Sequence, residues 1–360
     1  MAKIQLPLIL LIRDNELSMS NITNKYTGLR TLIVIRLLLG GKLSVLKIWN
    51  AVVCYASLFL RRTKSGKSPF LINFELWNEC NESCVFCRSE SDDIFDCNPD
   101  GVGAPIPKGK LDYQSYLKIL DSFANRLMMA IPYINGEPLM SKDIYKAIQA
   151  ATDRKIGTLI ASNGILLNEA NSRKLLASGL DLLKVHISGF TAPVHSIQHR
   201  KGDVERIKNN LIRFMDLRRE LGAKTIVMLD YIGYEHNHHE IDAARKFAFE
   251  HDMLFSIRPG NPRGMEETEP LQTTGPLPVD IPCDWLWTVL TIDWNGAVYP
   301  CCDHVVWSGA ASYGMAGQDD VSMMWNGEDA VNMRKTHLTQ GRTAIPICSQ
   351  CPRQGAKFKF

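Results

Sequence analysis

The sequence lacks several features that would narrow its function at once. It has no excess of charge of one sign, because 41 Lys and Arg residues are matched by 38 Asp and Glu residues. This balance gives no overall field that would call for nucleic acid or another acidic polymer as a partner. It also has no internal repeat and no low-complexity tract. At 360 residues and 45% hydrophobic, the chain is expected to be globular with a sizeable core.

Long apolar runs are missing as well. The opening "MAKIQLPLILLIRDNE" has only about eight apolar residues before its first charges and no small-residue cleavage site, so it fails as a secretory signal. The stretch "SVLKIWNAVVCYASLFLRR" is too short and too interrupted for a membrane span, which needs about 20 apolar residues. We therefore expect a cytoplasmic protein.

That second stretch nevertheless predicts an amphipathic helix, because its polar or small positions recur every three or four residues. Two interpretations stay open. The helix packs on the rest of the protein, or it lies at a membrane surface, so that residues 44–67 make a peripheral membrane contact. In the second case the basic tail approaches the lipid headgroups with Arg61, Arg62, Lys64 and Lys67.

The chain divides into a helical extension at residues 1–67, a large region at 68–260, a Pro/Gly-rich linker at 261–282 and a small region at 283–360. In the large region six short apolar runs alternate with helical patterns, which predicts a parallel sheet, open or curled into a barrel. Chemistry in such folds sits at the carboxyl ends of the strands. Helices are expected at 112–127, 140–154, 167–178, 203–221 and 238–251, the last opened by a capping box of Asn237 and Glu240.

The small region begins with a hairpin pattern, "WTVLTIDWNGAVYP", in which Asn295 and Gly296 form a strong two-residue turn signal. The remaining cysteines surround this hairpin. We therefore expect a small domain held together by a metal site. The run "HNHH" at 236–239 is expected at the surface.

Most of the ten cysteines are grouped at ligand spacing, which favours metal binding in a reducing compartment over disulfides. "CNESCVFC" places Cys80, Cys84 and Cys87 directly after the first predicted strand. Thiolates favour zinc or iron–sulfur clusters. A zinc site would need a fourth ligand, whereas Cys97 is ten residues away in a polar loop and no His lies close. Three cysteines on a four-iron cluster would leave one iron open.

The C-x3-C-x2-C spacing, with Phe86 before the last cysteine, resembles the signature of the radical S-adenosylmethionine (SAM) superfamily. The resemblance implies a partial (β/α)6 TIM-type barrel and a 4Fe-4S cluster on Cys80, Cys84 and Cys87. It further implies that SAM binds the open iron. The reduced cluster then cleaves SAM into methionine and a 5'-deoxyadenosyl radical.

Other segments at successive strand ends carry the same resemblance. "NGEPL" at 135–139 resembles the family's G-G-E-P segment, "SNG" at 162–164 its T-N-G segment, and "KVHISG" and "HRKGD" the segments that follow. Taken singly, they also fit a glycine turn, a helix N-cap and a solvated charge. The resemblance implies that SAM contacts Phe86, Gly136, Glu137, Ser162, Asn163, Ser188, Arg200 and Ile257.

The later cysteines read C-x12-G-x4-C followed by C-x2-C, which resembles a shortened, twitch-like SPASM domain of the same superfamily. The resemblance implies one auxiliary 4Fe-4S cluster, held by Cys283, Cys301, Cys348 and Cys351. A zinc ribbon is the alternative. With the first cluster and SAM, the expected cofactors are two 4Fe-4S clusters and SAM. Because a fully ligated cluster has no open iron, its expected task is electron transfer.

The cysteine arrangement is similar to that of the butirosin-pathway aminoglycoside dehydrogenase and the anaerobic sulfatase-maturating enzymes. The resemblance implies a radical SAM oxidoreductase, dehydrogenase-like, that oxidises a sugar, an aminocyclitol or another small polyol. A ribosomal-peptide maturase and a redox-neutral epimerase stay open, the latter with Cys302 as hydrogen donor; Cys302 and Cys97 are otherwise structural or spare ligands. A reducing partner such as flavodoxin or ferredoxin is expected. An iron–sulfur or zinc binding module without activity is the non-enzyme alternative.

Overall fold

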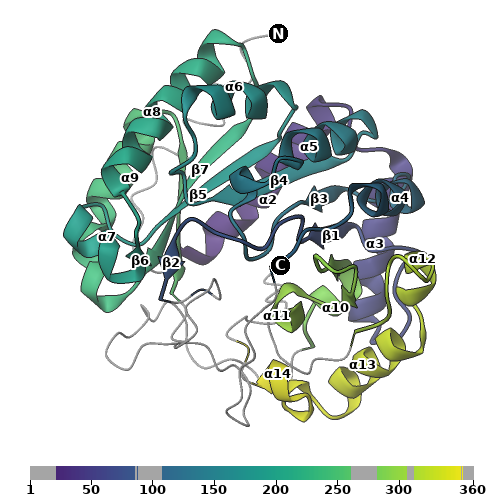
Figure 1. Ribbon diagram of the computed structural model, residues 1–360. Helices are drawn as coiled ribbons and strands as arrows, with labels where there is room; N and C mark the ends of the chain where they lie inside the picture. The colour runs from purple at the N-terminus through teal and green to yellow at the C-terminus, as the bar shows by residue number, and fades with distance from the viewer. Residues whose placement is uncertain are drawn as a thin grey trace.

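The structure is a computed structural model that describes residues 22–85, 87, 108–260, 282–305, 312–349 and 351. Its centre is an eight-stranded sheet in the order β10-β9-β1-β3-β4-β5-β7-β8 (Figure 1). Neighbouring strands pair in parallel except at the β10 edge. The strands are β1 (Leu71–Phe74), β3 (Met129–Ile131), β4 (Gly157–Ser162), β5 (Leu182–Ile187), β7 (Ile226–Gly233), β8 (Leu254–Pro259), β9 (Val289–Ile292) and β10 (Val298–Tyr299).

Helices join the six barrel strands in the predicted alternation, so the predicted partial barrel is confirmed. Their apolar faces and one face of the sheet form a single large core. An Asp or Asn side chain caps three of the helices by accepting a backbone N–H in the first turn, as Asp112, Asn168 and Asp203 do. The helices are α4 (Tyr113–Phe123), α5 (Ile144–Asp153), α6 (Glu169–Ala177), α8 (Val204–Glu220) and α9 (Ile241–Glu250).

The predicted start of the last barrel helix is wrong. Helix α9 begins at Ile241, after a 3-10 turn, η3 (Glu235–Glu240), and neither Asn237 nor Glu240 caps it with a side-chain hydrogen bond. The side chain of Asn237 is fully buried and donates to the carbonyl oxygen of Ser188. The Glu240 carboxylate accepts the backbone N–H of Thr191. Both side chains therefore fix the loop after β5 instead of the helix.

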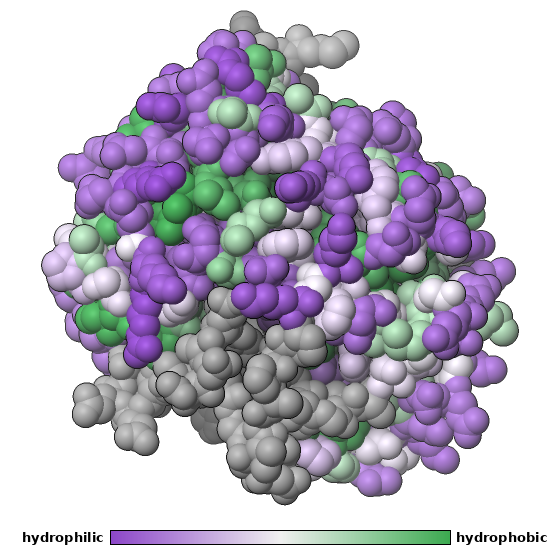
Figure 2. Space-filling model, in the orientation of Figure 1, coloured by the Kyte–Doolittle hydropathy of each residue, from purple (hydrophilic) through white to green (hydrophobic). Residues whose placement is uncertain are grey.

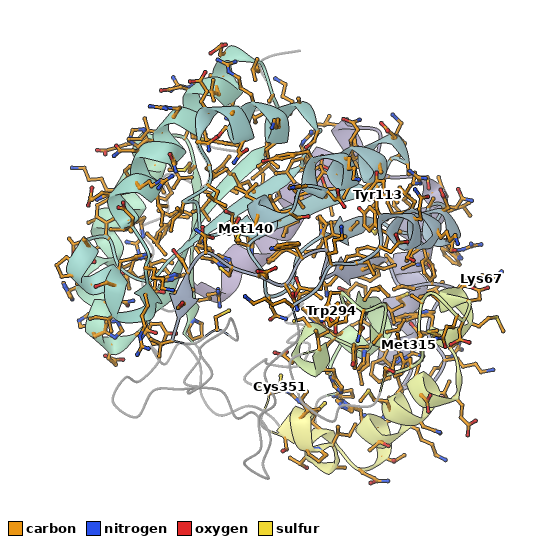
Figure 3. All side chains as sticks on the ribbon, in the orientation of Figure 1. Lys67, Tyr113, Met140, Trp294, Met315 and Cys351 are labelled. Carbon is orange, nitrogen blue, oxygen red and sulfur yellow. The ribbon has the colours of Figure 1, made fainter. Side chains whose placement is uncertain are left out.

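The C-terminal region adds its hairpin to the barrel sheet. Strand β9 pairs in parallel with β1, and β10 folds back antiparallel on β9. The hairpin is confirmed, but its turn is longer than the predicted two residues, because the N–H of Asp293 donates to the carbonyl oxygen of Ala297 at 2.9 Å and leaves residues 294–296 in the loop. Trp294 in this turn, labelled in Figure 3, packs on Gly109, where an added Cβ would lie 1.9 Å from the indole ring.

Short helices complete the C-terminal region, drawn in green and yellow at the lower right of Figure 1. They are α10 (Trp285–Thr288), α11 (Cys302–Val305), α12 (Val321–Met324), α13 (Glu328–Thr339), η4 (Arg342–Ala344) and α14 (Pro346–Ser349). On the face shown in Figure 2, hydrophilic side chains cover the helices, whereas hydrophobic ones gather over β5 and β7.

The N-terminal extension supplies two helices, α2 (Ile22–Leu39) and α3 (Val45–Phe59). The predicted amphipathic helix is thus present as α3, but it packs on the rest of the protein mainly through its polar side. Its buried residues are Lys47, Asn50, Cys54, Ser57 and Leu58. Within the described residues, none of the helices is both long enough and apolar enough to cross a membrane.

Candidate functional site

The first cysteine group lies in the loop that follows β1, at the carboxyl ends of the barrel strands. Cys84 belongs to a two-residue strand, β2 (Ser83–Cys84), which pairs antiparallel with β6 (His199–Arg200). The register places Cys84 opposite His199 and Ser83 opposite Arg200. The backbone therefore ties the "HRKGD" segment to the cysteine loop, a link that the sequence pattern alone did not suggest.

The thiols of this loop lie among polar groups, with donors beside Cys80 and acceptors beside Cys84 and Cys87. The N–H of Glu82 donates to Cys80 Sγ at 3.5 Å, and Asn163 Nδ2 lies 3.8 Å from the same sulfur. Cys87 Sγ lies 4.0 Å from the carbonyl oxygen of Asn135. Burial raises the pKa of Cys80 to about 12, and burial also places the pKa of Cys84 well above its ordinary value. Thiols in this setting become thiolates only when a cation lies among them, which fits an iron cluster.

Glu137 braces two neighbouring strand ends. Its carboxylate is buried and accepts the hydroxyl of Ser162 and the N–H of Asn163, each at 2.8 Å, and the N–H of Leu139 at 3.0 Å. These bonds join the loop after β3 to the end of β4. Asn163 then reaches the cysteine loop, because its Nδ2 donates to Asn81 Oδ1 at 2.9 Å. Glu137 therefore organises the site through Ser162 and Asn163.

Glu75, which was not predicted from the sequence, fixes the loop after β3 through hydrogen bonds to its backbone. Its carboxylate is fully buried and accepts the backbone N–H groups of Asn135 at 2.6 Å and Gly136 at 3.4 Å. Burial raises the pKa of Glu75 to about 8. Gly136 lies so close to the cysteine loop that an added Cβ would be 2.0 Å from the carbonyl oxygen of Trp77. Only glycine fits there.

A buried hydrogen-bonded chain links the end of β5 to the cysteine loop. Ser188 Oγ lies 3.0 Å from His199 Nε2, and His199 Nδ1 lies 2.9 Å from Glu82 Oε2 and 3.4 Å from Cys84 Sγ. The ring of His195 stacks on that of His199, with 4.3 Å between centroids and 8° between planes. Glu82, His195 and His199 are close enough for a metal ion. However, the in-plane lone pairs of two parallel stacked rings cannot converge on one ion.

Polar side chains also line the strands on the sheet face opposite to the main core. Asp230 on β7 is buried, accepts a hydrogen bond from Ser256 Oγ, and lies 2.9 Å from Arg258 Nε and 3.3 Å from His186 Nε2. Burial disfavours its charge, but Arg258 and Lys184 hold the pKa of Asp230 at about 2. Burial lowers the pKa of His186 to about 3. These side chains form what we call the polar wall. It carries one anion, Asp230, two cations, Arg258 and Lys184, and the neutral imidazole of His186.

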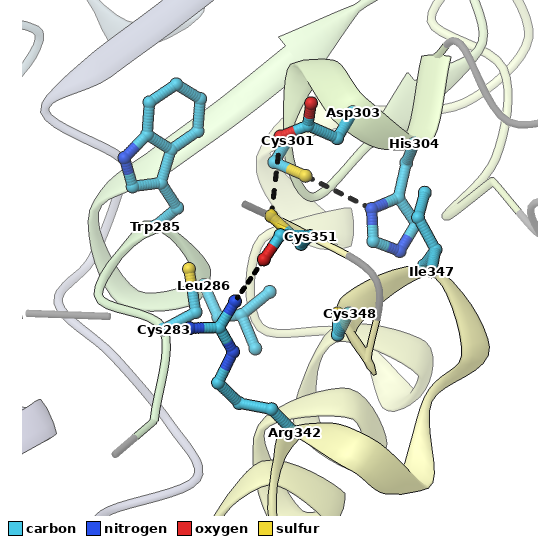
Figure 4. Close-up of a pocket in the computed structure, with 10 residues that line it drawn as sticks. All are labelled: Cys283, Trp285, Leu286, Cys301, Asp303, His304, Arg342, Ile347, Cys348 and Cys351. Carbon is cyan, nitrogen blue, oxygen red and sulfur yellow. Dashed lines mark hydrogen bonds between the residues drawn. The ribbon is translucent and has the colours of Figure 1, made fainter. Parts of the chain in front are cut away.

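The second cysteine group lines one pocket in the C-terminal region (Figure 4). Two of its members are far in sequence from the C-x2-C pair that supplies the other two, and the fold brings all four together, as it does for no other set of cysteines in the described part of the chain apart from the loop after β1. Cys351 Sγ lies 3.8 Å from Asp303 Oδ2, and Arg342 Nη2 donates to the carbonyl oxygen of Cys351 at 3.5 Å. The four are Cys283, Cys301, Cys348 and Cys351.

The electrostatics of this pocket also suit a cluster. Burial raises the pKa of both Cys283 and Cys348 to about 12, and burial places that of Cys301 well above its ordinary value. His304, another residue missed from the sequence, lies with its Nδ1 3.1 Å from Cys301 Sγ. Burial lowers the pKa of His304 to about 4, so the ring is neutral and able to donate to the sulfur.

Some predicted residues are not brought to these sites. Ile257 packs in the apolar core on the helix side of the sheet, away from the polar wall. Cys302 begins α11 and does not line the four-cysteine pocket. Phe86 and Cys97 lie outside the described residues. In the "HNHH" run, His238 and His239 are exposed as expected, whereas His236 is half-buried and Asn237 is buried.

A parallel α/β barrel with a cysteine loop at its strand ends, beside a second cysteine-lined pocket, defines the class of iron–sulfur barrel proteins. Residues 74–248 match the Radical SAM superfamily, and residues 283–352 match SPASM, an iron-sulfur cluster-binding domain. The chain therefore belongs to the radical SAM superfamily and carries a SPASM domain. Its radical SAM domain binds a 4Fe-4S cluster and SAM, and its SPASM domain binds further iron–sulfur.

Known proteins resemble parts of this chain. The AdoMet-dependent heme synthase of Methanosarcina barkeri is 30% identical over 128 residues, which are 36% of this chain and 34% of that protein. The matched segments span about a third of the length of such curated relatives. Two solved structures share the fold. Streptococcus suis SuiB bound to precursor peptide SuiA aligns at TM-score 0.59 and 14% identity over 79% of this chain and 70% of that one. BtrN in complex with AdoMet and 2-DOIA aligns at TM-score 0.50 and 18% identity over 79% and 94%.

Proposed function

We propose that this chain is a radical SAM oxidoreductase that oxidises a small polar substrate and passes the released electron to an auxiliary cluster in the four-cysteine pocket. The observation that carries the proposal is the pairing of two cysteine sites, one with three thiols and one with four. When bound, the first cluster and SAM supply a 5'-deoxyadenosyl radical that abstracts a hydrogen atom from the substrate. The side chains of this chain hold the clusters, position SAM and bind the substrate.

The three thiols of Cys80, Cys84 and Cys87 hold the first cluster and leave one of its four irons for SAM. The brace of Glu137 with Asn163 keeps the neighbouring loops in register with the cysteine loop. The side chains of Glu137 and Asn163 are buried, so their contacts hold the SAM pocket in shape before SAM binds.

Three further side chains are proposed to act on SAM or beside it. Ser188 presents its hydroxyl at the end of β5, oriented by His199. Arg200 is exposed, and its register opposite Ser83 places a cation beside the cysteine loop, suited to the SAM carboxylate. Phe86 remains the predicted neighbour of the adenine. Ile257 is not included, because its side chain belongs to the core.

The four thiols of Cys283, Cys301, Cys348 and Cys351 are proposed to hold one auxiliary 4Fe-4S cluster. Four protein ligands leave no iron open, so this site suits electron transfer. The neutral His304 beside Cys301 provides a hydrogen-bond donor to a thiolate, and such bonds tune a cluster's potential. A substrate radical that gives up an electron here and a proton to solvent becomes a carbonyl.

The polar wall supports a small hydroxylated substrate. Asp230, Arg258 and His186 present acceptors and donors within one cluster of side chains, which suits a sugar, an aminocyclitol or another polyol. A ribosomal peptide is the second candidate, because the fold is shared with SuiB, a protein solved with its precursor peptide. An epimerase that uses Cys302 as hydrogen donor would be redox-neutral.

The reducing partner is proposed to be a flavodoxin or ferredoxin in the cytoplasm, since none of the cysteines in the described residues forms a disulfide. Peripheral membrane contact through residues 44–67 is proposed on separate grounds, namely the side chains that helix α3 exposes.

The test is anaerobic reconstitution followed by iron and sulfide analysis and a labelled-substrate assay. Two clusters require about eight irons per chain. Deuterated sugars, aminocyclitols and candidate peptides are then incubated with SAM and reductant, and deuterium is followed into 5'-deoxyadenosine. Transfer from a polyol supports the proposal, and transfer only from a peptide favours the maturase. A protein that holds zinc alone would refute the radical mechanism and support the binding module.

A further inference from the structure

Helix α3 exposes its apolar side instead of burying it. The exposed positions follow one helical face, because residues 45, 49, 52 and 59 are three, four or seven positions apart, and the half-buried residue 56 lies on the same face. Among them, Trp49 is 65% exposed. A contiguous exposed face made of several large apolar side chains is typical of a surface that binds a partner or a membrane. The large exposed side chains are Val45, Leu46, Ile48, Trp49, Val52, Phe59 and Leu60.

The orientation of α3 is fixed by hydrogen bonds on its polar side. Lys47 is buried, and its Nζ donates to the carbonyl oxygens of Lys155 at 2.5 Å and Lys42 at 3.2 Å. Asn50 Nδ2 donates to the carbonyl oxygen of Ser68 at 2.9 Å. Rotating the helix to bury its apolar side would leave these groups without their partners, at a large cost. The apolar side is therefore held outward by the fold.

The same part of the chain carries a strong positive charge. Residues 17–74 contain nine Lys and Arg residues and no Asp or Glu, although the whole chain has a net charge of only +3. At the end of α3, Arg61, Arg62, Lys64 and Lys67 are all exposed. The end of α2 adds further exposed apolar side chains, with Leu38 at 50% and Leu39 at 74%.

We propose that the exposed face of α3 and the end of α2 bind an anionic lipid bilayer, with α3 lying in the plane of the interface. The apolar side chains enter the boundary between headgroups and acyl chains, and the basic residues contact anionic headgroups. This is surface binding by an amphipathic helix and requires no spanning segment. It does not depend on the proposed chemistry.

The anchoring contacts also set which way the barrel points. Lys42 binds Asp181, just before β5, and Lys47 binds the carbonyl of Lys155, just before β4. Both anchors lie at the amino ends of the strands, whereas the cysteine loop after β1 lies at the carboxyl ends. Docking through α3 therefore leaves the cysteine loop facing away from the lipid, open to a reductant in solution.

The test is flotation of the full, cluster-reconstituted protein with vesicles of phosphatidylcholine, with and without phosphatidylglycerol. We expect co-flotation with the mixed vesicles, weaker in pure phosphatidylcholine and at high salt. The double variant Trp49→Ser/Val52→Ser should lower the binding constant by at least about tenfold. Arg62→Gln/Lys64→Gln should lower it by roughly fivefold per charge, and only for mixed vesicles.

The matched control is Leu221→Ser/Met323→Ser, which removes two exposed apolar side chains elsewhere, at 47% and 74% exposure. This control should bind vesicles like the wild type. A second readout measures how deeply Trp49 enters the bilayer. Brominated lipids should quench Trp49 fluorescence, and Trp49→Phe should lose that quenching while still binding vesicles.

Four results would overturn the proposal. The wild type could stay out of mixed vesicles, or the Trp49/Val52 variant could bind like the control. The wild type could instead form a dimer in sedimentation that the Trp49/Val52 variant dissolves, with no vesicle binding, so that a second copy covers the face. Binding that appears only after removal of residues 2–21 would show that the chain's own apolar start occupies the face.

Discussion

Replacing Glu137 by Gln tests whether this carboxylate braces the SAM site. The side chain is 2% exposed and accepts three hydrogen bonds, from Ser162, Leu139 and Asn163. A Gln oxygen can keep the bonds to Ser162 and Leu139, but its amide NH2 would then face the N–H of Asn163. One buried donor left without an acceptor costs about 1–3 kcal/mol. We expect about 2 kcal/mol of lost stability and a weaker SAM site.

Urea unfolding and SAM titration by calorimetry, both anaerobic, measure the two effects. The control is Glu205→Gln, an exposed residue of α8 whose change should stay within about 0.5 kcal/mol. The reasoning is refuted if Glu137→Gln unfolds at the same urea concentration as the wild type and binds SAM equally well.

The same substitution has a pH signature. Burial raises the pKa of Glu137 to about 7, above its value of about 4.3 in an unfolded chain. The folded state therefore holds this proton more tightly, and the corresponding stability is present in full below pH 4.3 and lost as the pH rises to about 7. Stability of the wild type relative to Glu137→Gln should fall across that window. A constant difference would contradict the shift.

Three further predictions concern other parts of the molecule. Cys348→Ala should lower the iron content from about eight to about four per chain with 5'-deoxyadenosine formation retained, and an unchanged iron content would exclude Cys348 as a ligand. Gly136→Ala should lower the free energy of unfolding by about 3 kcal/mol in urea, because its Cβ meets the carbonyl oxygen of Trp77; wild-type stability would show that the two loops separate easily. Asp230→Asn should cost about 1–3 kcal/mol, since Arg258 loses its counter-charge, and an unchanged unfolding midpoint would mean that solvent replaces this ion pair.

The strand and helix order could be predicted from the sequence because each element has strong local periodicity and turn signals. The apolar runs around Ile72, Ile160 and Leu229 all became strands in the expected order. Helix starts were predictable where a single Asp or Asn caps the first turn. The start of α9 was not, since Asn237 and Glu240 make their bonds to the loop after β5, and no local pattern reveals a distant acceptor.

The cysteines of the candidate sites could be found from spacing, but their surroundings could not. Glu75 lies within an apolar run and gave no sign of the three backbone N–H groups that it accepts. His199 stood inside a quoted segment, yet its link to Cys84 depends on a pairing between strands far apart in the chain. The outward apolar side of α3 was hidden for the same reason, because Lys47 finds its acceptor at Lys155.

The most direct test of the central claim is reductive SAM cleavage by the reconstituted protein, with 5'-deoxyadenosine measured for wild type and Cys84→Ala. The account predicts 5'-deoxyadenosine from the wild type and none from Cys84→Ala, whose four-cysteine pocket should still hold a cluster visible by electron paramagnetic resonance after reduction. Formation of 5'-deoxyadenosine by Cys84→Ala, or none by a wild type loaded with about eight irons, would contradict it.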